Sequence, residues 1–414
     1  MYIKEQLPNG IRVVTEEIPH VRSVSIGLWV GVGSRDETDE NSGIAHFIEH
    51  MMFKGTKNRS AKQIAEELDA IGGQLNAFTA KEYTCYYAKT LDEHFPKSLD
   101  LLADMFFNSL YDPQEIDKER NVIIEEINMY EDAPDELIHD LFASTLWNNH
   151  PLGRSIIGTR EVVEKINRAD IISFLKTFYT PDQLVIAVAG NVKHDRVMEL
   201  ITPLFDRMEG KSTARNYAKP VPVYQVATKK KDTEQVHLCI GVPGLPLDHE
   251  QIYSLYVLNS ILGGGISSRL FQEIREERGL AYSVYSYHNS YKDAGLFSIY
   301  TGLSLKNIGP VVELITRELK QIKAGKVTEE EVFRAKEQLK GSLYLGLENV
   351  SNRMSRIGKS ELCLGRIITP EEAVEKINRV GIKDVQLLAE QLFASDKMVL
   401  TSIGPMDHKI DIVL

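Results

Sequence analysis

Apolar and polar positions follow two different periods along the first half of the chain. Residues 23–32 alternate and are rich in β-branched side chains, which predicts a strand. Residues 42–52 and 61–71 carry apolar side chains at the spacing of a helix face, which predicts two helices. The other elements predicted in this half are a strand pair within 75–89, helices at 92–108 and 113–131, a helix after Asp170 and a strand at 184–189.

The second half shows a similar succession of patterns. Its predicted elements are strands at 235–242, 281–288 and 295–302, and helices at 250–262, 267–277, 306–323 and 328–349. In both halves strands and helices are grouped, whereas they would alternate one by one in a parallel doubly wound sheet. The sequence therefore predicts an α+β fold, in which each half forms a mostly antiparallel sheet packed with helices.

Two segments of the first half recur in the second half in the same order. The hexapeptide VEKINR stands at 163–168 and again at 374–379, and residues 178–190 align with 392–404. The distance between the copies is too long for a solenoid repeat, so we interpret it as the duplication of a whole domain. The segment between the halves carries two prolines and a lysine run, which is typical of a boundary. The predicted division is a first domain at 1–207, a linker at 208–235 and a homologous second domain at 236–414.

Composition narrows the class of protein. The 414 residues are 43% hydrophobic and 26% charged, which is typical of a globular protein and argues against whole-chain disorder. No apolar run approaches the roughly 18 residues of a membrane span. The net charge of −11 argues against nucleic acids and anionic membranes as partners. Three widely spaced cysteines and the absence of signal-peptide features at the N-terminus predict a cytoplasmic protein.

The strongest chemical signal is the pattern H-x-x-E-H, formed by His46, Glu49 and His50. It lies in the helix predicted to begin near Asn41 and Ser42, which can act as N-caps. Residues four apart share a helix face, so both imidazoles can hold one Zn²⁺ and leave room for a water molecule whose proton the glutamate takes. The alternative is a pair of surface histidines spaced by chance, but the glutamate and the apolar surroundings favour a metal site.

A third ligand is expected from the helix predicted at 113–131. Glu119 and Glu126 are two helical turns apart on a stripe that they share with apolar residues. Burying carboxylates on such a stripe costs free energy unless they have a partner. Their spacing lets both face one cation, whereas Glu125 is expected to point to solvent. The alternative is an ordinary acidic helix.

These motifs resemble those of the pitrilysin family of zinc metallopeptidases, in which H-x-x-E-H is followed by a glutamate ligand. The chain is most similar to the branch of the mitochondrial processing peptidase β subunit and its small bacterial relatives, and the resemblance covers nearly the whole chain. The resemblance implies that His46, His50 and Glu126 are zinc ligands and that Glu49 is the general base. It also implies that Glu119 supports the site as an accessory glutamate.

The resemblance extends to residues that would bind substrate. Residues 72–79 read as a turn and an edge strand, to which an extended peptide can add as a further strand. A plain turn and strand is the alternative, but the resemblance implies that Asn76 and Ala77 contact the peptide. Phe78, on the same strand, is predicted to bind substrate with them. The second half has no H-x-x-E-H, and there the resemblance implies that Arg275 and Tyr282 hold substrate and stabilise an oxyanion.

Together these features predict a zinc-dependent endopeptidase that cleaves unfolded or extended peptides. Full-length relatives have four such domains, so a two-domain chain is expected to work as a homodimer or as a heterodimer with a related subunit. Two alternatives remain open. One is a non-catalytic structural subunit of a larger complex, and the other is an enzyme that is active only beside a different subunit.

Overall fold

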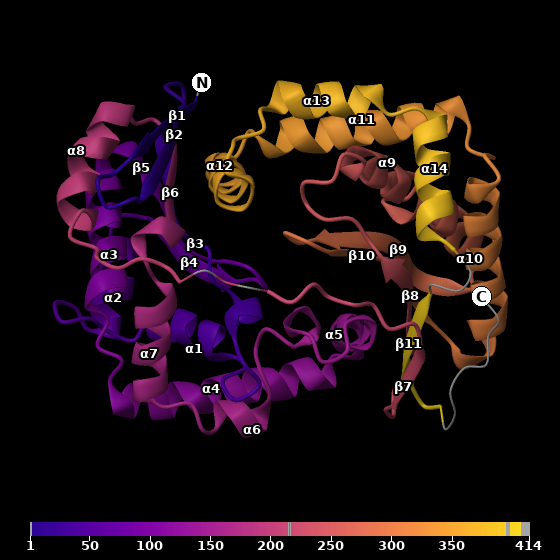
Figure 1. The fold of residues 1–414 in the computed structure, drawn as a ribbon, viewed down its shortest axis with the longest axis horizontal. Coiled ribbons are helices and arrows are strands. Elements are labelled where there is room, and N and C mark those ends of the chain that lie inside the picture. The colour runs from indigo at the N-terminus through magenta and orange to yellow at the C-terminus, as the bar shows by residue number, and fades with distance from the viewer. Residues whose placement is uncertain (1, 214, 216, 395–397, 407–414) are drawn as a thin grey trace. The chain divides into compact units, whose positions relative to one another are not determined.

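Two sheets, each packed with helices, organise the chain (Figure 1). The computed structural model describes residues 2–213, 215, 217–394 and 398–406. The chain divides into two units, which are described separately. Unit 1 contains the residues up to 128 together with 154–217 and 346–368, and unit 2 contains 129–153, 218–345 and the residues from 369 onward.

The sheet of unit 1 has six strands in the order β1-β2-β6-β3-β5-β4. β2 and β6 are parallel, and all other neighbours are antiparallel. The strands are β1 (Tyr2–Gln6), β2 (Arg12–Glu17), β3 (Ser23–Val30), β4 (Gln74–Thr79), β5 (Thr84–Leu91) and β6 (Leu184–Gly190). Within the described residues β4 pairs only with β5, so one side of β4 is a free sheet edge.

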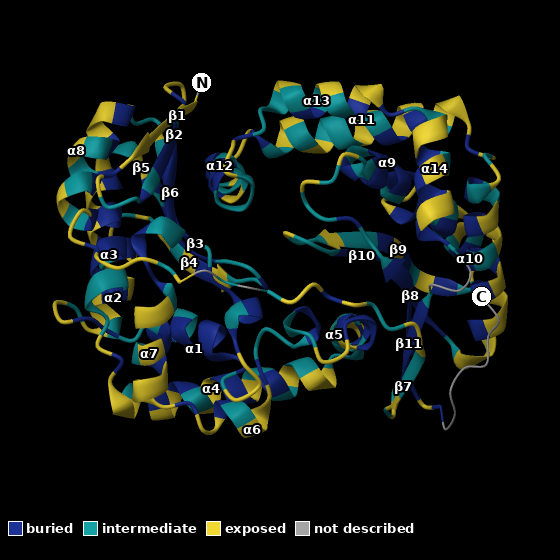
Figure 2. Cartoon of the chain, in the orientation of Figure 1, coloured by how far each residue is buried: buried dark blue, intermediate teal, exposed yellow. Residues whose placement is uncertain are grey.

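Successive side chains of this sheet point to opposite faces, as the pleat of a strand requires. Ile26 and Leu28 lie in the larger apolar layer, which the helices α1, α3, α7 and α8 fill. Trp29 and Cys85 lie in the opposite layer together with Met354 of α12. The central strands β3 and β6 are therefore almost fully buried (Figure 2). The helices of unit 1 are α1 (Ile44–Met51), α2 (Ala61–Asp69), α3 (Phe95–Asn108), most of α4 (Pro113–Asp132), α6 (Arg160–Val163), α7 (Arg168–Phe178), α8 (His194–Phe205) and α12 (Val350–Leu364).

Although α12 comes from the second half of the sequence, it packs on the sheet of unit 1. A Cβ atom at Gly27 would lie 2.5 Å from the Met354 sulfur, and one at Gly358 would lie 2.4 Å from Nε1 of Trp29. The helix and β3 thus approach each other through two glycines, where any side chain would collide.

The sheet of unit 2 has five strands in the order β7-β11-β8-β10-β9, of which only β7 and β11 are parallel neighbours. The strands are β7 (Val226–Lys230), β8 (Val236–Pro243), β9 (Ala281–Ser290), β10 (Gly295–Leu303) and β11 (Val399–Gly404). This order repeats β2-β6-β3-β5-β4 of unit 1, including its parallel pair. The predicted fold class, two related α+β domains with mostly antiparallel sheets, is confirmed. The helices of unit 2 are α5 (Pro134–Leu146), α9 (Ile252–Gly263), α10 (Ile308–Lys323), α11 (Glu329–Gly346), α13 (Pro370–Arg379) and α14 (Ile382–Leu392).

Some elements differ from those predicted. The segment predicted as a helix at 267–277 contains the π-helix η5 (Phe271–Glu276), and β7 lies inside the predicted linker. α5 belongs to unit 2 and α12 to unit 1, so each unit takes one helix from the other half of the sequence. The boundaries at 207 and 236 stay a prediction. Among the described residues, no helix has both the length and the apolar character needed to cross a membrane.

Candidate metal centre and active site

Three of the predicted site residues converge in unit 1: His46 and His50 on α1, and Glu126 on α4. These residues are called the metal group below. The two Nε2 atoms are 3.2 Å apart, and the carboxylate oxygens of Glu126 lie 3.7 Å from Nε2 of His46 and 3.6 Å from Nε2 of His50. The carboxylate is beyond ordinary hydrogen-bond distance of both rings, so a cation between them would satisfy all three. Two imidazoles and a carboxylate are a donor set that suits Zn²⁺.

Glu119 holds the ring of His50 from behind. Oε1 of Glu119 lies 2.8 Å from Nδ1 of His50, and Oε2 lies 2.6 Å from Nζ of Lys54. Burial raises the pKa of Glu119, but the hydrogen bonds from His50 and Lys54 outweigh it and lower the pKa below its usual value. Burial likewise lowers the pKa of His50, yet Glu119 and Glu126 raise it overall. When Nδ1 of His50 carries a proton and donates it to Glu119, the lone pair of Nε2 is left for a metal ion.

His46 is held differently. Its side chain is buried, and burial together with the neighbouring His50 lowers its pKa to about 3. The imidazole is therefore neutral near pH 7, as a metal ligand must be. Its Nδ1 atom is buried and has no hydrogen-bond partner among the described residues.

Glu49 lies on the same helix and is tied to the edge strand. Oγ1 of Thr79, the last residue of β4, donates a hydrogen bond of 2.5 Å to Oε2 of Glu49. Burial raises the pKa of Glu49, partly opposed by the hydrogen bond from Thr79 and by His50. A carboxylate with one oxygen held and a raised pKa is suited to accept and return a proton.

The N-terminus of α1 is not capped as predicted. Gly43 is the N-cap residue, with φ of 94° and no side chain, so the prediction of Asn41 or Ser42 is wrong. Oε2 of Glu37 accepts the Gly43 N–H at 2.8 Å, and Oε1 accepts the Ala45 N–H at 2.9 Å. Sequence reasoning missed Glu37, because an N-cap side chain usually belongs to the residue at the helix boundary.

The predicted peptide-binding residues lie on the edge strand β4. Asn76 and Phe78 are exposed, and Ala77 points into the apolar layer shared with α1. Oδ1 of Asn76 accepts the backbone N–H of Ala77 at 2.8 Å. The ring of Phe78 contacts the rings of Trp29 and Tyr83 at centroid distances of 5.7 and 6.2 Å. The strand therefore presents an aromatic side chain and a free backbone edge; their role in binding stays a prediction.

Two family models match consecutive parts of the chain. "Insulinase (Peptidase family M16)" matches residues 12–160, and "Peptidase M16 inactive domain" matches residues 165–339. The chain belongs to the M16 family of peptidases, which includes insulinase and pitrilysin. The family predicted from the motifs is thus confirmed. The description of the second model agrees with the lack of an H-x-x-E-H motif in the residues it matches.

Relatives that match nearly all of this M16 chain are named zinc proteases. "Uncharacterized zinc protease YmxG" of Bacillus subtilis is 50% identical over 397 residues, which cover 96% of this chain and 97% of the relative. A zinc protease of Mycobacterium leprae is 44% identical over 414 residues, which cover 97% and 92%. A protease from Helicobacter pylori, 25% identical, superposes with a TM-score of 0.89 over 98% of this chain and 99% of its own. A peptidase M16 inactive domain from Pseudomonas fluorescens, 19% identical, shares the fold with a TM-score of 0.91 and 99% coverage of both chains.

The two site residues predicted in the second half of this M16 chain lie together in unit 2. The guanidinium carbon of Arg275 lies 4.8 Å from the ring centroid of Tyr282 and 4.7 Å from that of Phe271. Tyr282 is 76% exposed. Their predicted action on substrate stays a prediction. On α4, Glu125 is exposed as expected.

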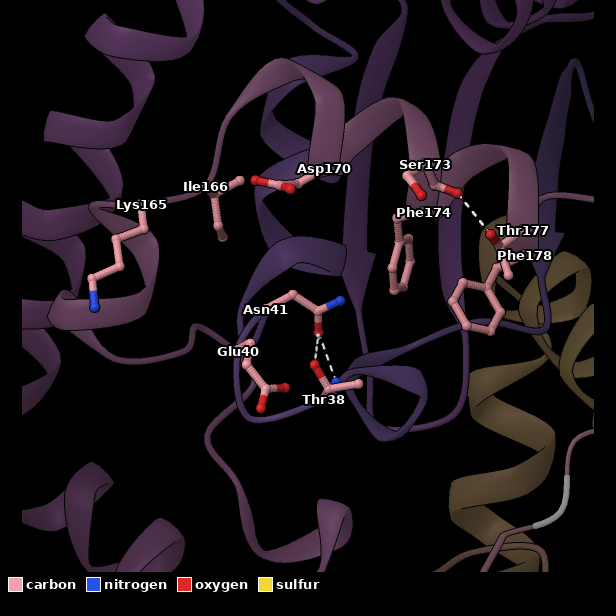
Figure 3. A pocket seen from close by; sticks show the side chains of 10 residues that line it. All are labelled: Thr38, Glu40, Asn41, Lys165, Ile166, Asp170, Ser173, Phe174, Thr177 and Phe178. Atoms are coloured by element: carbon pink, nitrogen blue, oxygen red, sulfur yellow. Dashed lines mark hydrogen bonds between the residues drawn. The ribbon is translucent and has the colours of Figure 1, made fainter.

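A cavity of about 320 Å³ lies in unit 1 between α7 and the segment that leads into α1 (Figure 3). Phe174 and Phe178 form its apolar side, and the backbone N–H of Thr38 donates to Oδ1 of Asn41 at 2.6 Å on the other side. No member of the metal group lines it. The candidate metal centre is therefore separate from this cavity.

Proposed function

We propose that the protein is a zinc-dependent endopeptidase that cleaves unfolded or extended peptides. The observation that carries the proposal is the convergence of the metal group beside Glu49, whose carboxylate is fixed by Thr79. Membership of the M16 family, with zinc proteases among the relatives, supports the same conclusion.

His46, His50 and Glu126 would hold the Zn²⁺ ion. When bound, zinc supplies a Lewis acid for a peptide carbonyl and increases the acidity of water. The chain prepares both rings for this role: burial keeps His46 neutral, and the hydrogen bond to Glu119 fixes the tautomer of His50.

Glu49 is the residue that moves protons. Thr79 occupies its Oε2, which leaves Oε1 to take a proton from the attacking water. The raised pKa of Glu49 helps the carboxyl group to keep that proton and then to deliver it to the leaving amine.

The free edge of β4 is the proposed docking place for substrate. An extended peptide can add to an exposed strand through main-chain hydrogen bonds. The backbone N–H of Ala77 now donates to the side chain of Asn76, and a carbonyl of the bound peptide would take the place of that acceptor. Chain segments already paired within a folded protein do not offer this backbone, so unfolded or extended peptides are the expected substrates.

The finer parts of the proposal rest on the family resemblance. They are the binding of substrate and stabilisation of an oxyanion by Arg275 and Tyr282, and a homodimer or heterodimer with a related subunit as the working form. A cytoplasmic location belongs to the same set of proposals and rests on the sequence.

Zinc content and cleavage of unstructured peptides, both measured on the purified protein, test the proposal. The key variant is Glu49→Gln, and the control is Glu66→Gln, an exposed carboxylate on α2 paired with Lys62. We expect zinc in all three proteins, with cleavage lost only in Glu49→Gln. Zinc binding without cleavage of any unstructured peptide by the wild type would contradict the proposal and favour a non-catalytic subunit or a missing partner subunit.

A further inference from the structure

The two histidines of the metal group are oriented by different means. Nδ1 of His50 is held by Glu119 at 2.8 Å, whereas Nδ1 of His46 is buried without a hydrogen-bond partner among the described residues. Metal-binding histidines almost always donate their second ring N–H to a carboxylate, a carbonyl or water. No described residue makes such a contact with Nδ1 of His46, so within the described part of the chain its position depends on packing and on the backbone of α1.

That backbone is the first turn of a short helix. α1 spans Ile44–Met51, so His46 is its third residue. The first N–H groups of a helix have no partner within the helix and need acceptors from outside. The N-cap residue Gly43 has no side chain to offer one.

Glu37 supplies these acceptors from outside the helix. Its two carboxylate oxygens accept the N–H groups of Gly43 at 2.8 Å and of Ala45 at 2.9 Å. Burial raises the pKa of Glu37 to about 8, whereas the hydrogen bonds from Gly43 and Ala45 and the positive end of the helix dipole favour the ionised carboxylate. Glu37 thus fixes the backbone on the N-terminal side of His46 with both of its oxygens.

Glu37 is itself rigidly placed. It is only 4% exposed, and its carbonyl accepts a hydrogen bond of 2.8 Å from Nη1 of Arg154. The carbonyl of Arg154 in turn accepts Nζ of Lys81, just after β4, and the backbone N–H of Arg35 donates to the carbonyl of Lys81 at 2.7 Å. The segment that carries Glu37 is therefore joined at several points to the end of the edge strand.

We propose that Glu37 is the positioning residue of His46 and sets the zinc affinity of the centre through the first turn of α1. This inference rests on the proposed zinc site. Glu37→Gln keeps the shape of the side chain but turns an NH₂ group toward one of the two backbone N–H groups. The first turn then loses an acceptor, and zinc affinity falls by about 10-fold or more, as it does when outer contacts of metal ligands are removed.

The matched control is Glu361→Gln. Glu361 is another fully buried carboxylate of unit 1, which lies on α12 and pairs with Lys4 at 2.8 Å and with Arg12 at 3.2 Å. Both variants exchange one buried carboxyl group for an amide, and both are expected to lower the thermal midpoint. Only Glu37→Gln is expected to weaken zinc binding, measured by competition with a chromogenic chelator, and to speed amide hydrogen exchange over residues 43–47.

The outcomes separate this inference from the proposed function. Equal zinc affinity in the wild type and in folded Glu37→Gln overturns the inference alone. An equal loss in Glu361→Gln also overturns it, because the effect is then one of general stability. A wild type that binds no zinc contradicts the inference together with the proposed function. If Glu37→Gln does not fold, Glu37→Asp takes its place, because its shorter side chain holds the oxygens farther from the N–H groups of Gly43 and Ala45; it is held to the same two criteria.

Discussion

Replacing Thr79 by valine removes one hydrogen bond from Glu49 and keeps the branched shape of the side chain. The bond is 2.5 Å long and stabilises the ionised form of the carboxylate. A hydrogen bond to a charged group contributes about 1.5–3 kcal/mol, and one pKa unit corresponds to about 1.36 kcal/mol. Its loss should therefore raise the pKa of Glu49 by about 1–2 units.

The pH dependence of kcat/KM for peptide cleavage measures this shift. Glu49 must be ionised to act as a base, so the acidic limb of the Thr79→Val profile should move upward by about 1–2 pH units. Thr79→Ser retains the hydroxyl and should keep the limb of the wild type. An acidic limb that stays in place in Thr79→Val, with zinc content unchanged, would refute the positioning of Glu49 by Thr79.

Two further predictions concern the metal group and acid stability. The Glu126→Gln variant should lose most of its bound zinc, whereas the control variant Glu125→Gln, changed at the exposed neighbouring residue, should keep it. Metal analysis after dialysis measures both, and equal zinc content in the two variants would exclude Glu126 as a ligand. Burial raises the pKa of Asp104, but hydrogen bonds from Thr56 and Arg59, among others, lower it below its usual 3.8. The ionised Asp104 thus stabilises the fold above pH 3.8, and this contribution is lost as the pH falls further. In that acidic range the free energy of urea unfolding should depend less on pH in Asp104→Asn than in the wild type. An equal pH dependence in the two proteins would refute this.

The sequence alone predicts those parts of the structure whose cause is local. The i, i+4 spacing of His46 and His50 places them on one helix face, and the two-turn spacing of Glu119 and Glu126 does the same on α4. The repeated segments reveal the duplication. Each copy ends in an apolar strand, β6 or β11, and these two strands occupy the same place in their sheets. In each case the residues that form the sequence pattern belong to a single helix or to a segment and its repeat.

Other features depend on contacts between distant segments and are not visible in the sequence. The buried residues Val350, Met354, Ile357 and Gly358 follow helical spacing, which is consistent with α12, but nothing in the spacing tells that the helix packs against β3. Glu37 is similar, since it acts on a helix that begins seven positions later, at Ile44. Its role follows only from the path of the intervening loop.

Diffraction from crystals of the zinc-loaded protein, recorded at the zinc absorption edge, tests the central claim most directly. The account predicts one strong anomalous peak within coordination distance of Nε2 of His46, Nε2 of His50 and the carboxylate of Glu126. A zinc peak at any other place in unit 1, with none between these three residues, would contradict it.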